Sequence, residues 1–127
     1  MIKKLDSEHE NVLAIEIIDE YIQEDLQQFE NWFEEMHKSG QQQLNILFKI
    51  DQLPISHISF KTIINDALFS MKNIDHCKHI AMVGHSKVEK VVIEMESFGY
   101  NKSKKGRVMK YFDAKDIDKA WEFVNTK

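Results

Sequence analysis

The feature that most constrains the fold is an apolar run near the middle of the chain, residues 80–83, which stops at Gly84 and is followed by His85 and Ser86. An apolar run without alternation is typical of a central parallel strand that is covered by helices on both faces. A serine directly after the strand favours a helix start, because its hydroxyl accepts hydrogen bonds from free N–H groups of the first turn. The run therefore predicts an α/β protein with a candidate ligand-binding turn at residues 84–87.

Hydrophobic periodicity extends this pattern over the rest of the chain. Strands are predicted where apolar residues alternate or run together, at 2–5, 12–18, 44–50, 79–84 and 108–112. Helices are predicted where apolar residues recur every three or four positions, at 22–40, 57–72, 86–99 and, after an N-cap at Asp113, 117–124. This order predicts one α/β domain over 1–127, with a mainly parallel five-stranded sheet, an antiparallel N-terminal edge strand and four helices.

Length and composition fit a single globular domain. The chain has 127 residues, of which 43% are hydrophobic and 30% charged. No apolar run approaches the ~18 residues of a membrane span, and the first residues turn acidic without a segment apolar enough for a secretory signal. Cys77 is the only cysteine, so an internal disulfide is excluded and the residue is expected to serve packing. We therefore expect a cytoplasmic protein.

Charge is distributed unevenly along the chain. Residues 1–50 hold 4 basic and 11 acidic residues, whereas residues 51–127 hold 13 and 10. The acidic total argues against a nucleic-acid-binding protein, because such proteins neutralise phosphates with a basic face. One basic group is a candidate contact for an anionic membrane surface or another anionic partner, with a solvated loop as the alternative: Lys102, Lys104, Lys105, Arg107 and Lys110.

The turn after the central strand resembles a nucleophile elbow only in part. Gly84 and Ser86 match the first two fixed positions of that motif, but Val88 stands where the second glycine is required. All six histidines precede Ser86, so the serine has no base in the expected order. We therefore do not predict an enzyme and treat Ser86 as a helix cap.

Metal and cofactor sites are not predicted either. His76 and His79 could share a face, but a strand of about 20 Å separates His79 from His85. The four glycines cannot form a glycine-rich phosphate loop, so no cofactor is expected. What remains is anion binding by the free N–H groups at the turn formed by Gly84, His85, Ser86 and Lys87.

Aromatic residues gather on the first predicted helix. Trp32 lies beside the inner apolar stripe, next to Phe29 and Tyr21 in the same region. These three residues are a candidate interface for a partner protein or a second copy of the chain, and partly buried packing is the alternative.

Several segments resemble the SpoIIAA-like family of small bacterial proteins, a branch of the STAS-type domains that is also similar to the CRAL-TRIO fold. The resemblance covers nearly the whole chain and rests on 11–14, 24–25, 44–48, 79–84, 111–113 and 120–121. The family usually carries Gly-Asp and then Trp near the third helix, where this chain has Gly84-His85 and Val88. The resemblance implies a non-catalytic regulatory module.

The resemblance also implies a candidate phosphorylation switch. In anti-sigma-factor antagonists, the phosphorylated serine lies in an Asp-Ser-Ser-Gly motif at the start of the second helix. The corresponding segment here offers Ser56 and Ser59 but lacks the aspartate and the glycine. A helix N-cap is the alternative role for Ser56.

Two functions of different classes follow from the sequence. The first is a non-catalytic protein-interaction or regulatory module, with an unknown partner or a second copy in a homodimer. The second is a carrier or sensor of a small apolar or anionic ligand such as a lipid, which requires an apolar cavity of roughly 300 Å³ or more.

Overall fold

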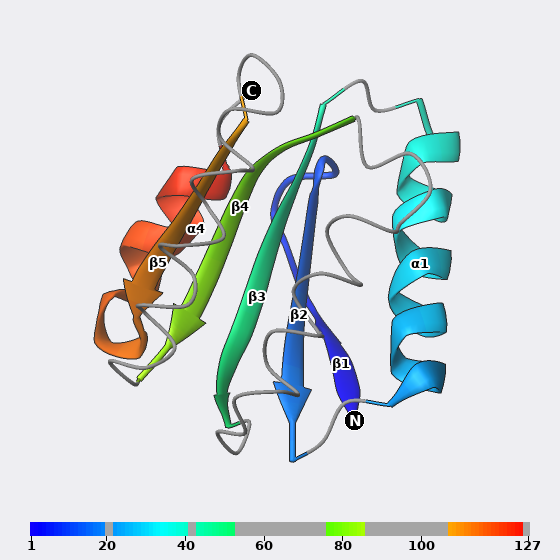
Figure 1. The fold of residues 1–127 in the computed structure, drawn as a ribbon. Coiled ribbons are helices and arrows are strands. Elements are labelled where there is room, and N and C mark those ends of the chain that lie inside the picture. Colours follow the sequence, from blue (N-terminus) through cyan, green and yellow to red (C-terminus); the bar gives the residue numbers. More distant parts are fainter. Residues whose placement is uncertain (20–21, 41–42, 53–75, 86–106, 126–127) are drawn as a thin grey trace.

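The computed structural model describes residues 1–19, 22–40, 43–52, 76–85 and 107–125 (Figure 1). The strands are β1 (Ile2–Leu5), β2 (Val12–Ile18), β3 (Leu44–Gln52), β4 (Cys77–Gly84) and β5 (Val108–Asp113). The described helices are α1 (Gln23–Lys38) and α4 (Ile117–Val124), and a 3-10 turn over Ala114–Asp116 precedes α4.

The strands form one five-stranded sheet in the order β1-β2-β3-β4-β5. β1 pairs with β2 in antiparallel fashion, with Ile2 opposite Ile17 and Leu5 opposite Ala14, while the other neighbours are parallel. The mainly parallel sheet with an antiparallel N-terminal edge strand is therefore confirmed.

The helices are confirmed only in part. The first predicted helix is α1, which ends before Gly40, a glycine with a φ of 94° that few other residues adopt. The helices expected at 57–72 and 86–99 lie outside the described residues. Asp113 was expected to cap the last helix, but it precedes the 3-10 turn and makes no side-chain capping hydrogen bond.

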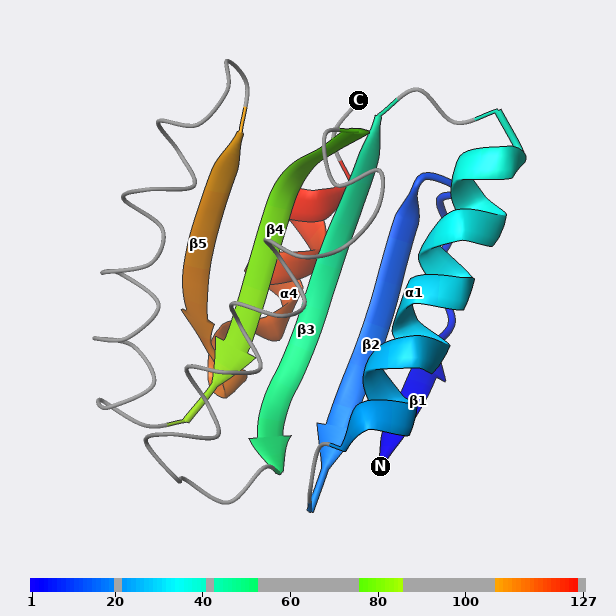
Figure 2. The same ribbon diagram turned by 45° about the vertical axis from the view of Figure 1, so that its right-hand side comes forward.

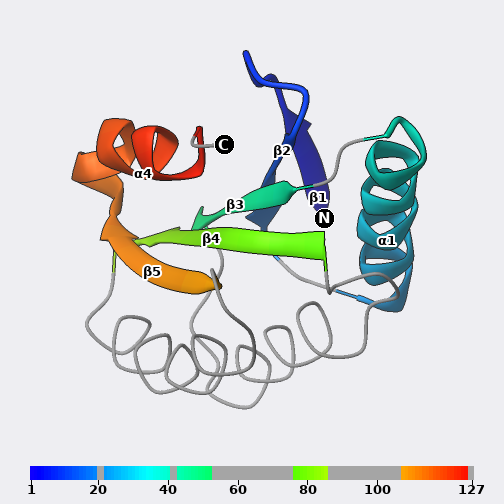
Figure 3. The same cartoon turned by 90° about the horizontal axis from the view of Figure 1, so that it is seen from above.

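Helices α1 and α4 lie on opposite faces of the sheet (Figures 2 and 3). The face toward α1 is built from the alternating residues of β3 that the sequence predicted, together with helix residues Phe29 and Phe33. The face toward α4 is smaller and includes Ala81, Ala120 and Val124. Both faces of the central strands are thus covered by apolar packing, as the unalternating run of β4 predicts.

The α4 face becomes polar farther along β2 and β3. There Lys49 Nζ lies 2.8 Å from Glu16 Oε2, and the two residues are also neighbours in the β2–β3 register. Among the described helices, none is long and apolar enough to cross a membrane.

Candidate functional site

The predicted anion-binding turn is described only at its start. Gly84 is buried at the end of β4, opposite Asp113 in the register with β5. His85 is exposed, and Ser86 and Lys87 lie outside the described residues. Anion binding at this turn therefore stays a prediction, as does phosphorylation of Ser56 or Ser59, which also lie outside.

The structure describes only Arg107 and Lys110 of the predicted basic group. Arg107 immediately precedes β5 and is only 8% exposed, so it is not available to a large anionic surface. Lys110 is exposed, and its ammonium lies 5.4 Å from the centroid of the Phe112 ring, in cation–π range. Residues 102, 104 and 105 lie outside the described residues.

The predicted aromatic interface needs a similar correction. Phe29 is fully buried, with its ring 5.1 Å from that of Phe48 in an edge-to-face arrangement, so assigning it to an interface was wrong. The reason is its place at the centre of the inner stripe of α1. Trp32 is partly buried and packs at the border of the same cluster, while Tyr21 lies outside the described residues.

Three of the described histidines make ring contacts in the fold. The His76 ring lies 4.4 Å from the His37 ring, and the His79 ring stacks on Phe123 at 4.8 Å. In the described parts of the chain, no group of three histidine, cysteine or acidic residues is arranged to hold a metal ion. Cys77 is buried at the start of β4, in agreement with its predicted packing role.

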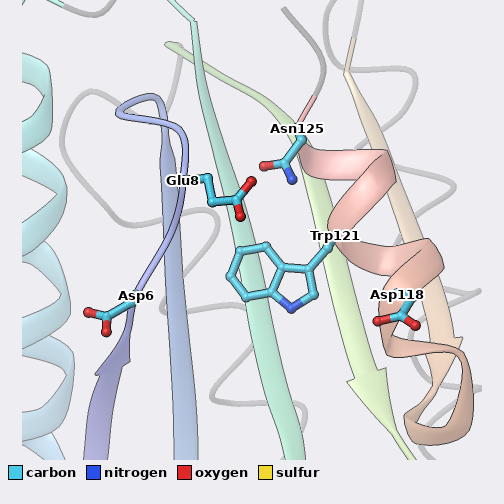
Figure 4. Close-up of a pocket in the computed structure, with 5 residues that line it drawn as sticks. All are labelled: Asp6, Glu8, Asp118, Trp121 and Asn125. Carbon is cyan, nitrogen blue, oxygen red and sulfur yellow. The ribbon is translucent and has the colours of Figure 1, made fainter.

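A pocket of about 390 Å³ lies between the β1–β2 connection and α4 (Figure 4). Its described lining consists of Asp6, Glu8, Asp118, Trp121 and Asn125. The indole of Trp121 extends from α4 across β3, and the carboxylate of Glu8 approaches it from the β1–β2 connection (Figure 4). Two segments more than a hundred residues apart in the sequence thus form one site.

Short-range hydrogen bonds shape the β1–β2 side of this pocket. The Ser7 hydroxyl donates to the carbonyl of His9 at 3.1 Å and accepts from the His9 N–H at 3.2 Å. Serine favours such turns because its hydroxyl can bond to nearby backbone groups. The Asn11 carbonyl then accepts the Asn45 N–H at 2.8 Å, which joins the connection to β3 and holds Glu8 over the sheet.

Buried polar contacts hold the α4 side. Asn45 is fully buried, and its Nδ2 donates to the Val124 carbonyl at 2.7 Å while its Oδ1 accepts the His79 N–H at 3.1 Å. His79 Nδ1 lies 3.2 Å from the Phe123 carbonyl. These contacts satisfy carbonyls in the last turn of α4, which have no partner within the helix. They fix the positions of Trp121 and Asn125 relative to the sheet.

The sequence reasoning missed this pocket. Neither Trp121 nor the segment from Asp6 to Asn11 was among the predicted site residues. No local pattern in the sequence could have found it, because the two acidic residues and Trp121 come together only when the sheet is assembled. Chemically, carboxylates, an amide and an indole face suit a cationic group that donates hydrogen bonds.

Comparison with known proteins identifies the fold family. The SpoIIAA-like family model matches residues 12–125 of this chain. No curated protein and no solved structure gives a significant match. The sheet, with its antiparallel edge strand and parallel centre, agrees with that match, and the chain belongs to the SpoIIAA-like family.

Proposed function

We propose that this protein is a non-catalytic interaction module of the STAS type that acts through protein contacts, with a second copy of the chain as its first partner. Membership of the SpoIIAA-like family supports a regulatory or interaction role. The observation that carries the proposal is an apolar border where α1 meets the edge strand β1.

Helix geometry places Trp32 on this border. Asp25 and Trp32 are seven residues apart, close to two turns, so they lie on the same side of α1. Asp25 Oδ2 is 3.2 Å from the Met1 nitrogen at the start of β1. The opposite flank of α1 carries His37, whose ring meets His76 before β4. Trp32 is therefore on the β1 side of the helix.

Other apolar groups adjoin this side. Ile2 of β1 and Met36 of α1 are partly buried against the same cluster as Trp32, and Ile22 at the start of α1 is 46% exposed. β1 is at the end of the described strand order, and edge strands carry backbone groups that can pair with another chain. Apolar side chains beside such an edge suit a protein interface.

Replacing Trp32 with alanine is expected to weaken self-association or partner binding more than it destabilises the fold. Large aromatic residues at interface centres often contribute 2 kcal/mol or more, so we expect a rise in the dimer dissociation constant of about 30-fold. Size-exclusion chromatography with light scattering measures this as a change from twice 15.0 kDa toward 15.0 kDa. Circular dichroism then reports whether the variant is folded.

Gln27→Ala is the matched control, because Gln27 is exposed on the same helix and lies about 140° around it from Trp32. It should leave the mass unchanged. An unfolded Trp32→Ala protein, or a folded one with unaltered association, would contradict the assignment of Trp32 to an interface.

The alternative function, a carrier of a small apolar or anionic ligand, finds less support. The pocket exceeds the size such a carrier requires, but three of its five described lining residues are acidic. Carboxylates repel anions and are poor partners for an acyl chain. The interaction module is therefore the better-supported proposal.

A further inference from the structure

We propose that the pocket between the β1–β2 connection and α4 binds an organic cation, a guanidinium or alkylammonium group on an aliphatic stem. This goes beyond the interaction function proposed above, since it rests on different residues. Its shared chemistry fits either a free amine or an arginine or lysine side chain of another protein.

The negative charge of the pocket lining favours a positively charged ligand. Asp6 and Glu8 come from the β1–β2 connection and Asp118 from α4, and the described lining contains no basic residue. Residues 1–50 as a whole carry 11 acidic and 4 basic residues, so this part of the molecule attracts cations. An anion or an uncharged lipid would find no matching group there.

The aromatic wall selects an organic cation. Trp121 packs one side against the apolar cluster of the α4 face and remains partly exposed toward the pocket. An indole held in this way offers its face to a cation, and tryptophan is the best of the aromatic residues for that contact. The packing also fixes the ring before the ligand arrives.

An unsatisfied acceptor points to a hydrogen-bond donor on the ligand. Asn125 Oδ1 is buried and has no hydrogen-bond partner among the described residues. In Figure 4 this oxygen is on the side of Asn125 that faces the Glu8 carboxylate. Buried polar atoms without a partner are rare in native proteins, and a ligand N–H between these two acceptors would satisfy both.

A metal ion is a poorer fit than an organic cation. The three carboxylates are not arranged as a metal-binding group among the described residues. Calcium requires six to eight oxygen ligands at about 2.3–2.6 Å. A volume of about 390 Å³ instead suits a cationic head group together with part of its stem.

Part of the pocket lies outside the residues that the family model matches. The family match begins at residue 12, so Asp6 and Glu8 lie before it, whereas Trp121 and Asn125 lie within it. Two of the five described lining residues therefore stand on a segment that the family match does not cover.

Tryptophan fluorescence tests the proposal directly. In a Trp32→Phe background, Trp121 is the only tryptophan, and its emission is titrated with agmatine and with spermidine at constant ionic strength. We expect a saturable change. Glu8→Gln should raise the dissociation constant about tenfold, because it removes a charge without changing the shape. Glu24→Gln, an exposed acid on α1, should change it less than about twofold.

Calorimetry with Trp121→Leu supplies a readout that does not depend on fluorescence, and binding of agmatine should be lost in that folded variant. A short arginine-containing peptide separates the two sources: tighter binding of the peptide indicates a protein side chain, and tighter binding of the free amine indicates a small molecule. The proposal would be overturned if the fluorescence changed linearly with ligand and sodium chloride gave the same change. It would also be overturned if Glu8→Gln and its parent bound with equal affinity, or if calcium bound saturably and more tightly than the amines.

Discussion

Replacing Phe29 with alanine is expected to lower the free energy of unfolding by about 3–5 kcal/mol. The side chain is fully buried, and its ring packs edge to face on Phe48 of β3. Truncation removes apolar contacts and leaves a cavity between α1 and the sheet, which the surrounding strands cannot fill. Urea denaturation followed by circular dichroism measures the loss.

Two control variants test whether the loss of stability comes from the lost buried volume. Phe29→Leu keeps most of the buried volume and should cost much less than the alanine variant. Gln28→Ala changes an exposed neighbour and should alter the free energy by less than about 0.5 kcal/mol. If Phe29→Ala were as stable as the parent but failed to associate, Phe29 would belong to an interface after all.

Replacing Asn45 with alanine is expected to cost about 2–4 kcal/mol, the second large effect. The substitution removes the hydrogen-bond partner of a buried backbone group, the Val124 carbonyl, and of a partly buried one, the His79 N–H. A buried group left without its partner costs about 1–3 kcal/mol. Thermal or urea denaturation measures the total.

Hydrogen exchange locates the effect. Because Asn45 holds the last turn of α4, amide exchange over 117–125 should accelerate more than exchange over α1. Asn31→Ala, an exposed substitution on α1, is the matched control. Uniform acceleration across both helices, or no loss of stability, would show that Asn45 does not anchor α4.

The sheet could be predicted from the sequence because its signals are local. The alternation of Leu44, Ile46, Phe48 and Ile50 marked one buried face of β3, and all four are buried in the cluster that includes Phe29 and Phe33 of α1. The edge strand predicted over residues 2–5 also pairs with β2 in the predicted antiparallel direction. Apolar residues that recur every two positions in a strand, or every three or four positions in a helix, can be recognised in the sequence without any tertiary information.

The site could not be predicted in this way because it depends on contacts distant in sequence. Asn45 looks like an exposed residue in an alternating strand, yet it is fully buried because the end of α4 supplies a carbonyl for it. Phe29 and Trp32 are both aromatic residues of one predicted helix. Only tertiary packing shows that Phe29 lies in the core and Trp32 at its border. The pocket joins Glu8 to Trp121, a pairing that no local pattern reveals.

Native mass spectrometry of gently purified protein tests the central claim, a non-catalytic interaction module, most directly. We predict a dimer of twice 15.0 kDa that carries no apolar or anionic small molecule. The Trp32→Ala variant should be observed as single chains. A single chain that retains a lipid or another anionic molecule, released on denaturation, would contradict the claim and establish a carrier.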